Sequence, residues 1–94
     1  MHINLEAIQA IVDPELHERL RAEKLAYNVA LGSAVRSLRE SAGLRQSDIE
    51  GLSTKQVGRI ERGEAHPRLD SLRQLARAHG LSTNEYLNQL AEHR

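Results

Sequence analysis

The feature that most constrains the fold is a run of apolar residues spaced three, four or seven positions apart between residues 14 and 42. The residues of this stripe are Leu16, Leu20, Tyr27, Leu31, Ala34 and Leu38. Such spacing predicts a helix with one buried face. Gly32 and Ser33 interrupt the run, so two interpretations stand: one long bent helix, or two helices of which Ser33 caps the second.

The composition favours helices throughout the chain. Its 94 residues include fourteen Leu and eleven Ala, but no Phe, Trp or Cys. A core of Leu and Ala is typical of helices rather than of a sheet sandwich. The absence of Cys excludes disulfides and thiolate zinc sites. No apolar run approaches the roughly 20 residues that cross a bilayer, so we expect no membrane partner. A chain without Cys suits the reducing cytoplasm, and together with the Leu and Ala content this predicts one all-α protein in the cytoplasm.

Cap and turn residues divide the remainder of the chain into short helices. The pattern predicts an amphipathic helix over residues 4–12, a helical turn over 46–50, helices over 54–62 and 69–79, and a last helix from about residue 83. Asp13 and Pro14 separate the first of these from the long stripe, since Asp caps helices and Pro fits their first position. Gly43, Gly63 and Gly80 end the elements that they follow.

The charges balance over the whole chain, with 13 basic and 13 acidic residues, but they are unevenly distributed. Residues 1–35 carry three basic and five acidic groups, whereas residues 36–68 carry seven basic and five acidic groups. A locally basic segment can bind phosphates even in a neutral chain. The centre of the sequence is therefore the region to search for a nucleic-acid contact.

The predicted helix over residues 54–62 carries the most informative polar face. Ser53 precedes it as an N-cap, and Val57 and Ile60 occupy its buried positions. The side chains left on the outer face are Thr54, Lys55, Gln56 and Arg59. These types read base edges, and such residues near the start of a short helix suit a recognition helix in the major groove. The backbone N–H groups at the helix start could also bind a phosphate.

An ordered set of motifs over residues 31–90 resembles the Cro/repressor-type (XRE) helix-turn-helix DNA-binding domains. Residues 31–44 are similar to the first helix of that family, and Gln46 stands at its Gln position. Residues 51–53 resemble the turn, and 57–63 resemble the end of the recognition helix. The resemblance implies an all-α fold, a five-helix lambda-repressor-like bundle over residues 29–94. Residues 1–28 would form an N-terminal helical arm for dimerisation or partner binding.

The resemblance also implies roles for individual residues. The residues implied to contact DNA are Ser53, Thr54, Lys55, Gln56, Arg59, Gln46 and Arg68. Gln46 would contact phosphate and brace the recognition helix, and Arg68 would touch the DNA backbone. Arg39 and Glu61 fall on positions that form a partly buried ion pair between the first helix and the recognition helix.

The chain departs from the family between Gln46 and Ser53, which are seven residues apart. The family usually has about ten residues here, so nearly one helical turn of about 3.6 residues is missing. Removing a whole turn keeps Ile49 in phase with the core. The second helix is therefore expected to be short.

Three functions are compatible with these features. The first is sequence-specific binding of double-stranded DNA by a homodimeric transcriptional regulator, most simply a repressor on a palindromic operator, because one module this small makes few contacts alone. The second is an antitoxin that regulates its own operon and binds a basic toxin through the acidic residues 1–35. The third is a protein–protein adaptor that does not bind DNA, which the zero net charge supports.

The sequence predicts neither an enzyme nor a metal protein. Its five His residues are scattered without ligand spacing, so no metal site is expected. No Ser-His-Asp set and no pair of carboxylates stands out as catalytic. We therefore expect no catalytic residue and no cofactor.

Overall fold

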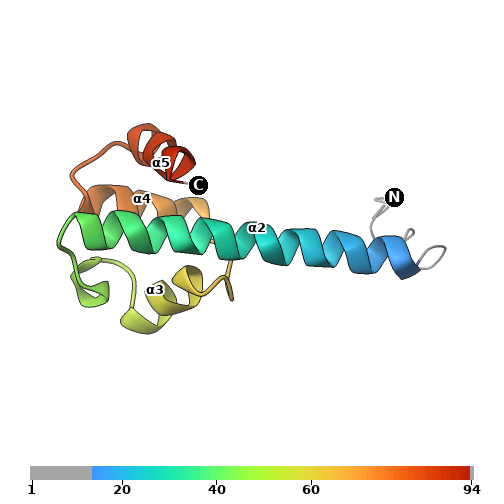
Figure 1. Cartoon of the computed structure of the whole chain (residues 1–94). Helices are drawn as coiled ribbons and strands as arrows, with labels where there is room; N and C mark the ends of the chain where they lie inside the picture. Colours follow the sequence, from blue (N-terminus) through green and yellow to red (C-terminus); the bar gives the residue numbers. More distant parts are fainter. Residues whose placement is uncertain (1–13, 94) are drawn as a thin grey trace, which may run out of the picture.

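The computed structural model of the chain describes residues 14–93, and the regular structure in this range is helical throughout (Figure 1). The elements are α2 (Pro14–Ser41), the 3₁₀ turn η1 (Gln46–Asp48), α3 (Thr54–Glu61), α4 (Leu69–Ala78) and α5 (Thr83–Glu92). The long α2 crosses the molecule, with α3 on one side and α4 and α5 on the other (Figure 1). The predicted helix over residues 4–12 lies outside the described residues.

The expected count of five bundle helices is not supported, because the described residues contain four α-helices. The second helix of the expected bundle is the three-residue turn η1. Asp48 holds this turn, since its carboxylate accepts a hydrogen bond of 2.7 Å from the backbone N–H of Arg45. This bond, together with the Arg45 side chain, lowers the pKa of Asp48.

α2 is one uninterrupted helix, so the interpretation of two helices with Ser33 as a cap is wrong. Gly32 serves a different purpose, which is the close approach of α2 to the end of α3. A Cβ at Gly32 would lie 2.6 Å from the carbonyl oxygen of Glu61 and closer still to that of Ile60. The glycine is therefore needed for packing between helices rather than for a break within one.

The core lies between α2 and the shorter helices, and every α-helix contributes to it. Its buried apolar residues are Ala34, Val35, Leu38, Ile49, Val57, Ile60, Leu75, Ala76, Tyr86 and Leu90. Complete burial of one large aliphatic side chain stabilises a fold by about 1.5–3 kcal/mol. Tyr86 is fully buried and its hydroxyl has no hydrogen-bond partner among the described residues. Burial raises the pKa of Tyr86, and the charge of Glu61 raises it further.

Side-chain caps fix where α3 and α5 begin. At α3, the Ser53 hydroxyl accepts from the backbone N–H of Gln56 at 3.0 Å, and Gln56 Oε1 accepts from the N–H of Ser53 at 2.8 Å. Ser82 and Glu85 exchange the same two bonds at α5, each at 3.1 Å. Each box satisfies N–H groups that a helix start leaves without partners.

The loop over residues 63–68 crosses α2 and marks the edge of the bundle. Gly63 packs against Val29, which leaves no room for a Cβ on Gly63. The ring of His66 stacks on Tyr27 at 5.9 Å between centroids, and its Nδ1 lies 3.0 Å from Oδ1 of Asn28. N-terminal to this crossing, α2 extends away from the other helices (Figure 1). None of the described helices is long and apolar enough to span a membrane.

Candidate nucleic-acid interface

α3 has one face inside the bundle and one face in solvent. Val57, Gly58, Ile60 and Glu61 are buried against the other elements. The four side chains predicted to reach outward are all exposed: Thr54, Lys55, Gln56 and Arg59. This division follows from the 3.6-residue period, because positions 57 and 60 share one side of the helix. The capping box at Ser53 fixes where the exposed face begins.

A buried ion pair attaches α3 to α2. Arg39 Nε donates to Glu61 Oε2 at 2.6 Å, and Arg39 Nη2 donates to Oε1 at 3.0 Å. Arg39 also donates from Nη1 to the backbone carbonyl of Leu44 at 2.8 Å. The bond to Glu61 raises the pKa of Arg39. Two-point pairing of this kind sets both distance and orientation, so it holds α3 in one place on α2.

Gln46 takes part in the same network. Its Nε2 donates to Glu61 Oε1 at 3.1 Å, so the Glu61 carboxylate receives three hydrogen bonds from two side chains. The side chain of Gln46 is thus directed at the buried end of α3. This contact braces α3, and it is made although the second helix is reduced to η1.

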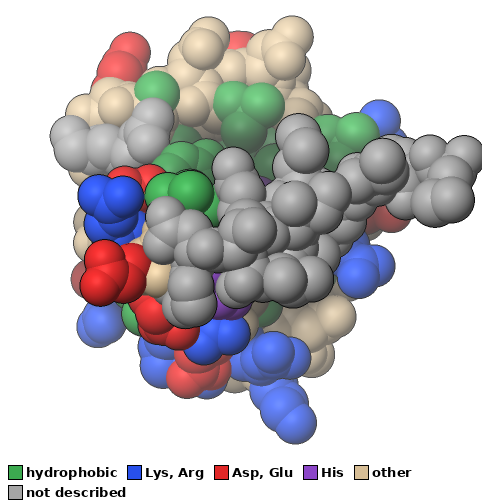
Figure 2. Space-filling model, turned by 90° about the vertical axis from the view of Figure 1, so that its right-hand side faces the viewer, with side chains coloured by type: hydrophobic (Ala, Val, Ile, Leu, Met, Phe, Trp, Pro, Cys, Tyr) green, Lys and Arg blue, Asp and Glu red, His purple; other side chains and the backbone are tan. Residues whose placement is uncertain are grey.

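Most basic residues of the central segment are neutralised within the protein. Four of the seven basic residues in 36–68 form ion pairs: Arg36 with Glu40, Arg39 with Glu61, Arg45 with Asp48, and Arg62 with Glu64. Within the described part of the chain, the other three form none; they are Lys55, Arg59 and Arg68. Figure 2 looks along α2 from its N-terminal end and shows most Lys and Arg side chains in the lower half, on the α3 side.

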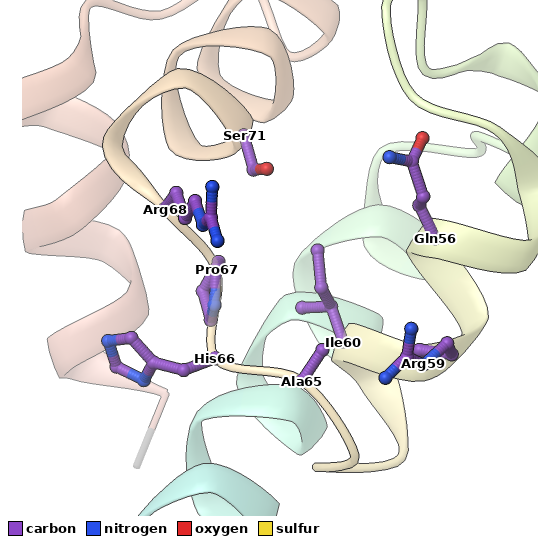
Figure 3. Close-up of a pocket in the computed structure, with 8 residues that line it drawn as sticks. All are labelled: Gln56, Arg59, Ile60, Ala65, His66, Pro67, Arg68 and Ser71. Atoms are coloured by element: carbon purple, nitrogen blue, oxygen red, sulfur yellow. The ribbon is translucent and has the colours of Figure 1, made fainter.

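The groove between α3 and the start of α4 brings two of these cations together (Figure 3). It has a volume of about 310 Å³. Its lining residues are Gln56, Arg59, Ile60, Ala65, His66, Pro67, Arg68 and Ser71. Arg59 stands on the α3 wall and Arg68 on the opposite wall (Figure 3). An anion that enters this groove would meet positive charge from both sides.

Besides Gln46, two more of the predicted contact residues already have partners within the chain. The hydroxyl of Ser53 and the Oε1 of Gln56 are engaged in the capping box of α3. While the box is closed, the two N–H bonds of the Gln56 amide are not engaged, whereas one of the two lone pairs of its carbonyl oxygen is used. Reading adenine needs a donor and an acceptor, so the closed box restricts how Gln56 could present its oxygen to a base. The spacing of Ser53 and Gln56 is itself a capping-box signature that sequence reasoning did not use.

The contact of His66 with α2 was missed from the sequence. The sequence pattern gives His66 no partner, whereas its ring is held by Tyr27 and Asn28. No local pattern predicts this contact, because the residues are 38 and 39 positions apart. The contact positions the loop that carries Arg68.

Comparison with known protein families decides the class of this module. A family model described as a helix-turn-helix domain matches residues 30–87, which is more than half of the chain. The chain belongs to the helix-turn-helix domain family. No curated protein matches the sequence.

Within this helix-turn-helix domain, η1 stands where the first motif helix is expected, the segment from Ile49 to Ser53 forms the turn, and α3 is the second helix. Membership assigns the chain to the DNA-binding and transcription-regulating proteins, a class that is typically not enzymatic. No group of three or more His, Asp or Glu that could hold a metal ion occurs within residues 14–93. The family match begins at residue 30, within α2.

Proposed function

We propose that this protein binds a specific sequence in double-stranded DNA and regulates transcription as a homodimer, most simply as a repressor. The observation that carries the proposal is the set of unpaired cations. Lys55, Arg59 and Arg68 have no ion-pair partner within residues 14–93, while the other four basic residues of the central segment are paired. A cation left unpaired beside a groove remains available for phosphate or for a base edge.

The exposed face of α3 would enter the major groove. There Lys55 and Arg59 would donate to guanine, and the methyl group of Thr54 would contact the thymine methyl. Arg68, across the groove from Arg59, would contact the DNA backbone (Figure 3). Base contacts specify the sequence, whereas the backbone contact sets the orientation of the domain on the duplex.

Gln46 and the N-terminus of α3 would have supporting roles. Gln46 braces Glu61 through one donor, which leaves its second amide hydrogen for a phosphate. Ser53 holds the helix start in place, and the N–H groups there would face the DNA backbone. Gln56 would add a donor beside the base-reading residues.

DNA binding and dimerisation or partner binding would be carried out by different parts of the chain. Residues 29–94 would form the DNA-binding domain, and residues 1–28 would serve as an arm for dimerisation or partner binding. Specific sites in DNA are usually read by dimers, because a single small module makes too few contacts. A palindromic operator would match the two-fold symmetry of a homodimer.

Selection of bound duplexes from a random DNA pool tests this function. We expect a palindromic consensus, and an affinity that falls steeply as salt is raised, because bound phosphates release counterions. Absence of any DNA affinity at low salt would contradict the proposal and would favour the adaptor without DNA binding.

An antitoxin is the second candidate function, and the acidic balance of residues 1–35 favours it, with five acidic against three basic groups. Many toxins of such pairs are basic proteins, so this segment would bind one by charge. Purification of the full chain from its own source would then recover a small basic partner. A neighbouring gene for such a protein would support the same conclusion.

A further inference from the structure

The half of α2 that precedes the family match carries its apolar stripe beyond the bundle. Each residue advances about 100° around a helix of 3.6 residues per turn. On this geometry Leu16, Leu20, Tyr27 and Leu31 share one side of α2. They lie about 100–160° around the helix from Gly32, which faces α3. The stripe is therefore on a different side of α2 from the proposed recognition helix.

The stripe continues into a shallow apolar groove between α2 and α5. The groove has a volume of about 100 Å³, and its lining residues are Tyr27, Leu31, Leu87, Leu90 and Ala91. Tyr27 is 47% exposed and Leu87 is 38% exposed, whereas Leu16 and Leu20 are half-buried within the chain. Figure 2 shows hydrophobic side chains mainly in the upper half of the view, on the α5 side. In this view the hydrophobic side chains are thus mainly separate from the charged side chains of the lower half.

We propose that this stripe and groove bind a second copy of the chain, with the two α2 helices antiparallel about a two-fold axis between Glu23 and Lys24. This symmetry places Leu16 of one copy opposite Leu31 of the other copy. It likewise places Leu20 of one copy opposite Tyr27 of the other. Leu16 and Leu20 of one copy would thereby reach the groove of the other.

The charges of this half-helix support pairing with itself. Residues 14–29 carry three acidic groups, Glu15, Glu18 and Glu23, and three basic groups, Arg19, Arg21 and Lys24. The proposed axis brings Glu23 of one copy opposite Lys24 of the other, twice in each dimer. Because a negative and a positive side chain flank the axis, each copy meets the opposite charge on the other copy. A partner that carries only one sign of charge would be repelled by one of the two side chains.

The remaining residues of the chain are a poor match for the groove. They number 13 before Pro14, and the helix predicted over residues 4–12 would span about 13 Å at 1.5 Å per residue. Tyr27 lies thirteen residues along α2 from Pro14, or about 20 Å. A helix of that length folded back from Pro14 would therefore reach Leu16 and Leu20 but end before the groove at Tyr27 and Leu87.

The spacing of the two α3 helices in such a dimer suits DNA. The α3 contacts on α2 run from Gly32 to Arg39. Their centre is about twelve residues, or about 18 Å, from the proposed axis. The two recognition helices would then be offset by about 36 Å along α2, to which the sideways separation of the two α2 helices adds; successive turns of one DNA face are about 34–36 Å apart. This step rests on the proposed function, whereas the stripe, the groove and the charges do not.

Light scattering on the full chain, together with three kinds of variant, tests the proposal. We expect twice the chain mass of 10.5 kDa, and a dimer weakened roughly tenfold or more by Leu20→Glu, which would bury an unpaired charge. Glu23→Lys should weaken the dimer, and adding Lys24→Glu should restore it. Leu25→Glu is the matched control, since Leu25 is 59% exposed on the side of α2 opposite Tyr27.

A wild-type monomer would overturn the proposal and leave residues 1–13 as the cover of the stripe. A dimer that resists Leu20→Glu, or that Leu25→Glu dissociates equally, would also overturn it. Circular dichroism of each variant checks the fold, and the charge reversal keeps the test valid if Leu20→Glu unfolds. A monomer that still binds specific DNA contradicts this inference alone, whereas a dimer of the expected kind without DNA affinity contradicts the proposed function alone.

Discussion

The charged side chains on the inner face of α3 have partners within the protein, whereas those on its outer face do not form ion pairs within the described residues. On the inner face, the carboxylate of Glu61 is buried and receives three hydrogen bonds from Arg39 and Gln46. On the outer face, Lys55 and Arg59 are exposed and form no ion pair within the described residues. A buried charge requires partners, whereas an exposed one loses little by remaining unpaired. One short helix can therefore be fixed in a fold on one side and left available to a ligand on the other.

The largest effect is expected from Glu61→Gln, which breaks the inner network. The change leaves Arg39 charged and buried without its counter-ion, so the free energy of unfolding should fall by about 3–5 kcal/mol. Thermal or urea unfolding followed by circular dichroism measures this. Glu18→Gln is the control, because Glu18 pairs with Arg21 in solvent and should cost less than about 1 kcal/mol. Equal losses of unfolding free energy in the two variants would mean that the buried ion pair stabilises the fold no more than an exposed one.

Arg59→Ala should have the next largest effect, and on binding rather than on folding. We expect a loss of about 1–3 kcal/mol in affinity for the selected duplex and relaxed base preference at one position. The unfolding midpoint should stay unchanged, since the Arg59 side chain is exposed. Arg19→Ala removes an exposed cation from the distant half of α2 and should leave affinity for a single half-site intact. If Arg59→Ala weakens all duplexes equally, Arg59 contacts phosphate only.

Ser53→Ala removes the cap that holds the start of the outer face. Loss of one N-cap typically costs about 0.5–2 kcal/mol of stability. DNA affinity should fall with it, because Gln56 and the first turn of α3 lose their fixed geometry. Comparison with Ser82→Ala at α5, which has the same box, separates the two effects. That variant should lose similar stability but keep its affinity for DNA.

The smallest effect is expected from Tyr86→Phe beneath the inner face. The hydroxyl of Tyr86 is buried without a partner in the described residues, so removing it should leave stability unchanged or raise it by up to about 1 kcal/mol. Chemical denaturation measures the difference. A marked loss of stability would show that the hydroxyl has a partner in solution.

The helix boundaries could be predicted from the sequence because their signals are local. Ser53 and Ser82 begin helices within one residue of the expected positions, and Gly43 and Gly63 follow helix ends with positive φ. Gly32 could not be interpreted in this way. A glycine that breaks a helix and one that lets two backbones approach look alike in sequence, and the carbonyls of α3 decide between them.

The outer face of α3 could also be predicted, because periodicity alone separates Val57 and Ile60 from their polar neighbours. The partners of those polar groups could not. Which basic residues are neutralised depends on acidic residues brought near by the fold. The family resemblance, and no local pattern, implied that Arg39 pairs with Glu61 and that Gln46 braces the recognition helix. The contact of His66 with Tyr27 and Asn28 also depends on the fold. Interactions between distant segments are the part that sequence patterns leave open.

The most direct test of the central claim is to map the DNA contact on the protein by NMR. The ¹⁵N-labelled chain would be titrated with the duplex obtained by selection, and the amide shifts compared along the chain. We expect the largest changes at residues 53–59 and around Arg68, where the unpaired cations meet the groove. Largest changes on α5, with α3 unchanged, would contradict the account.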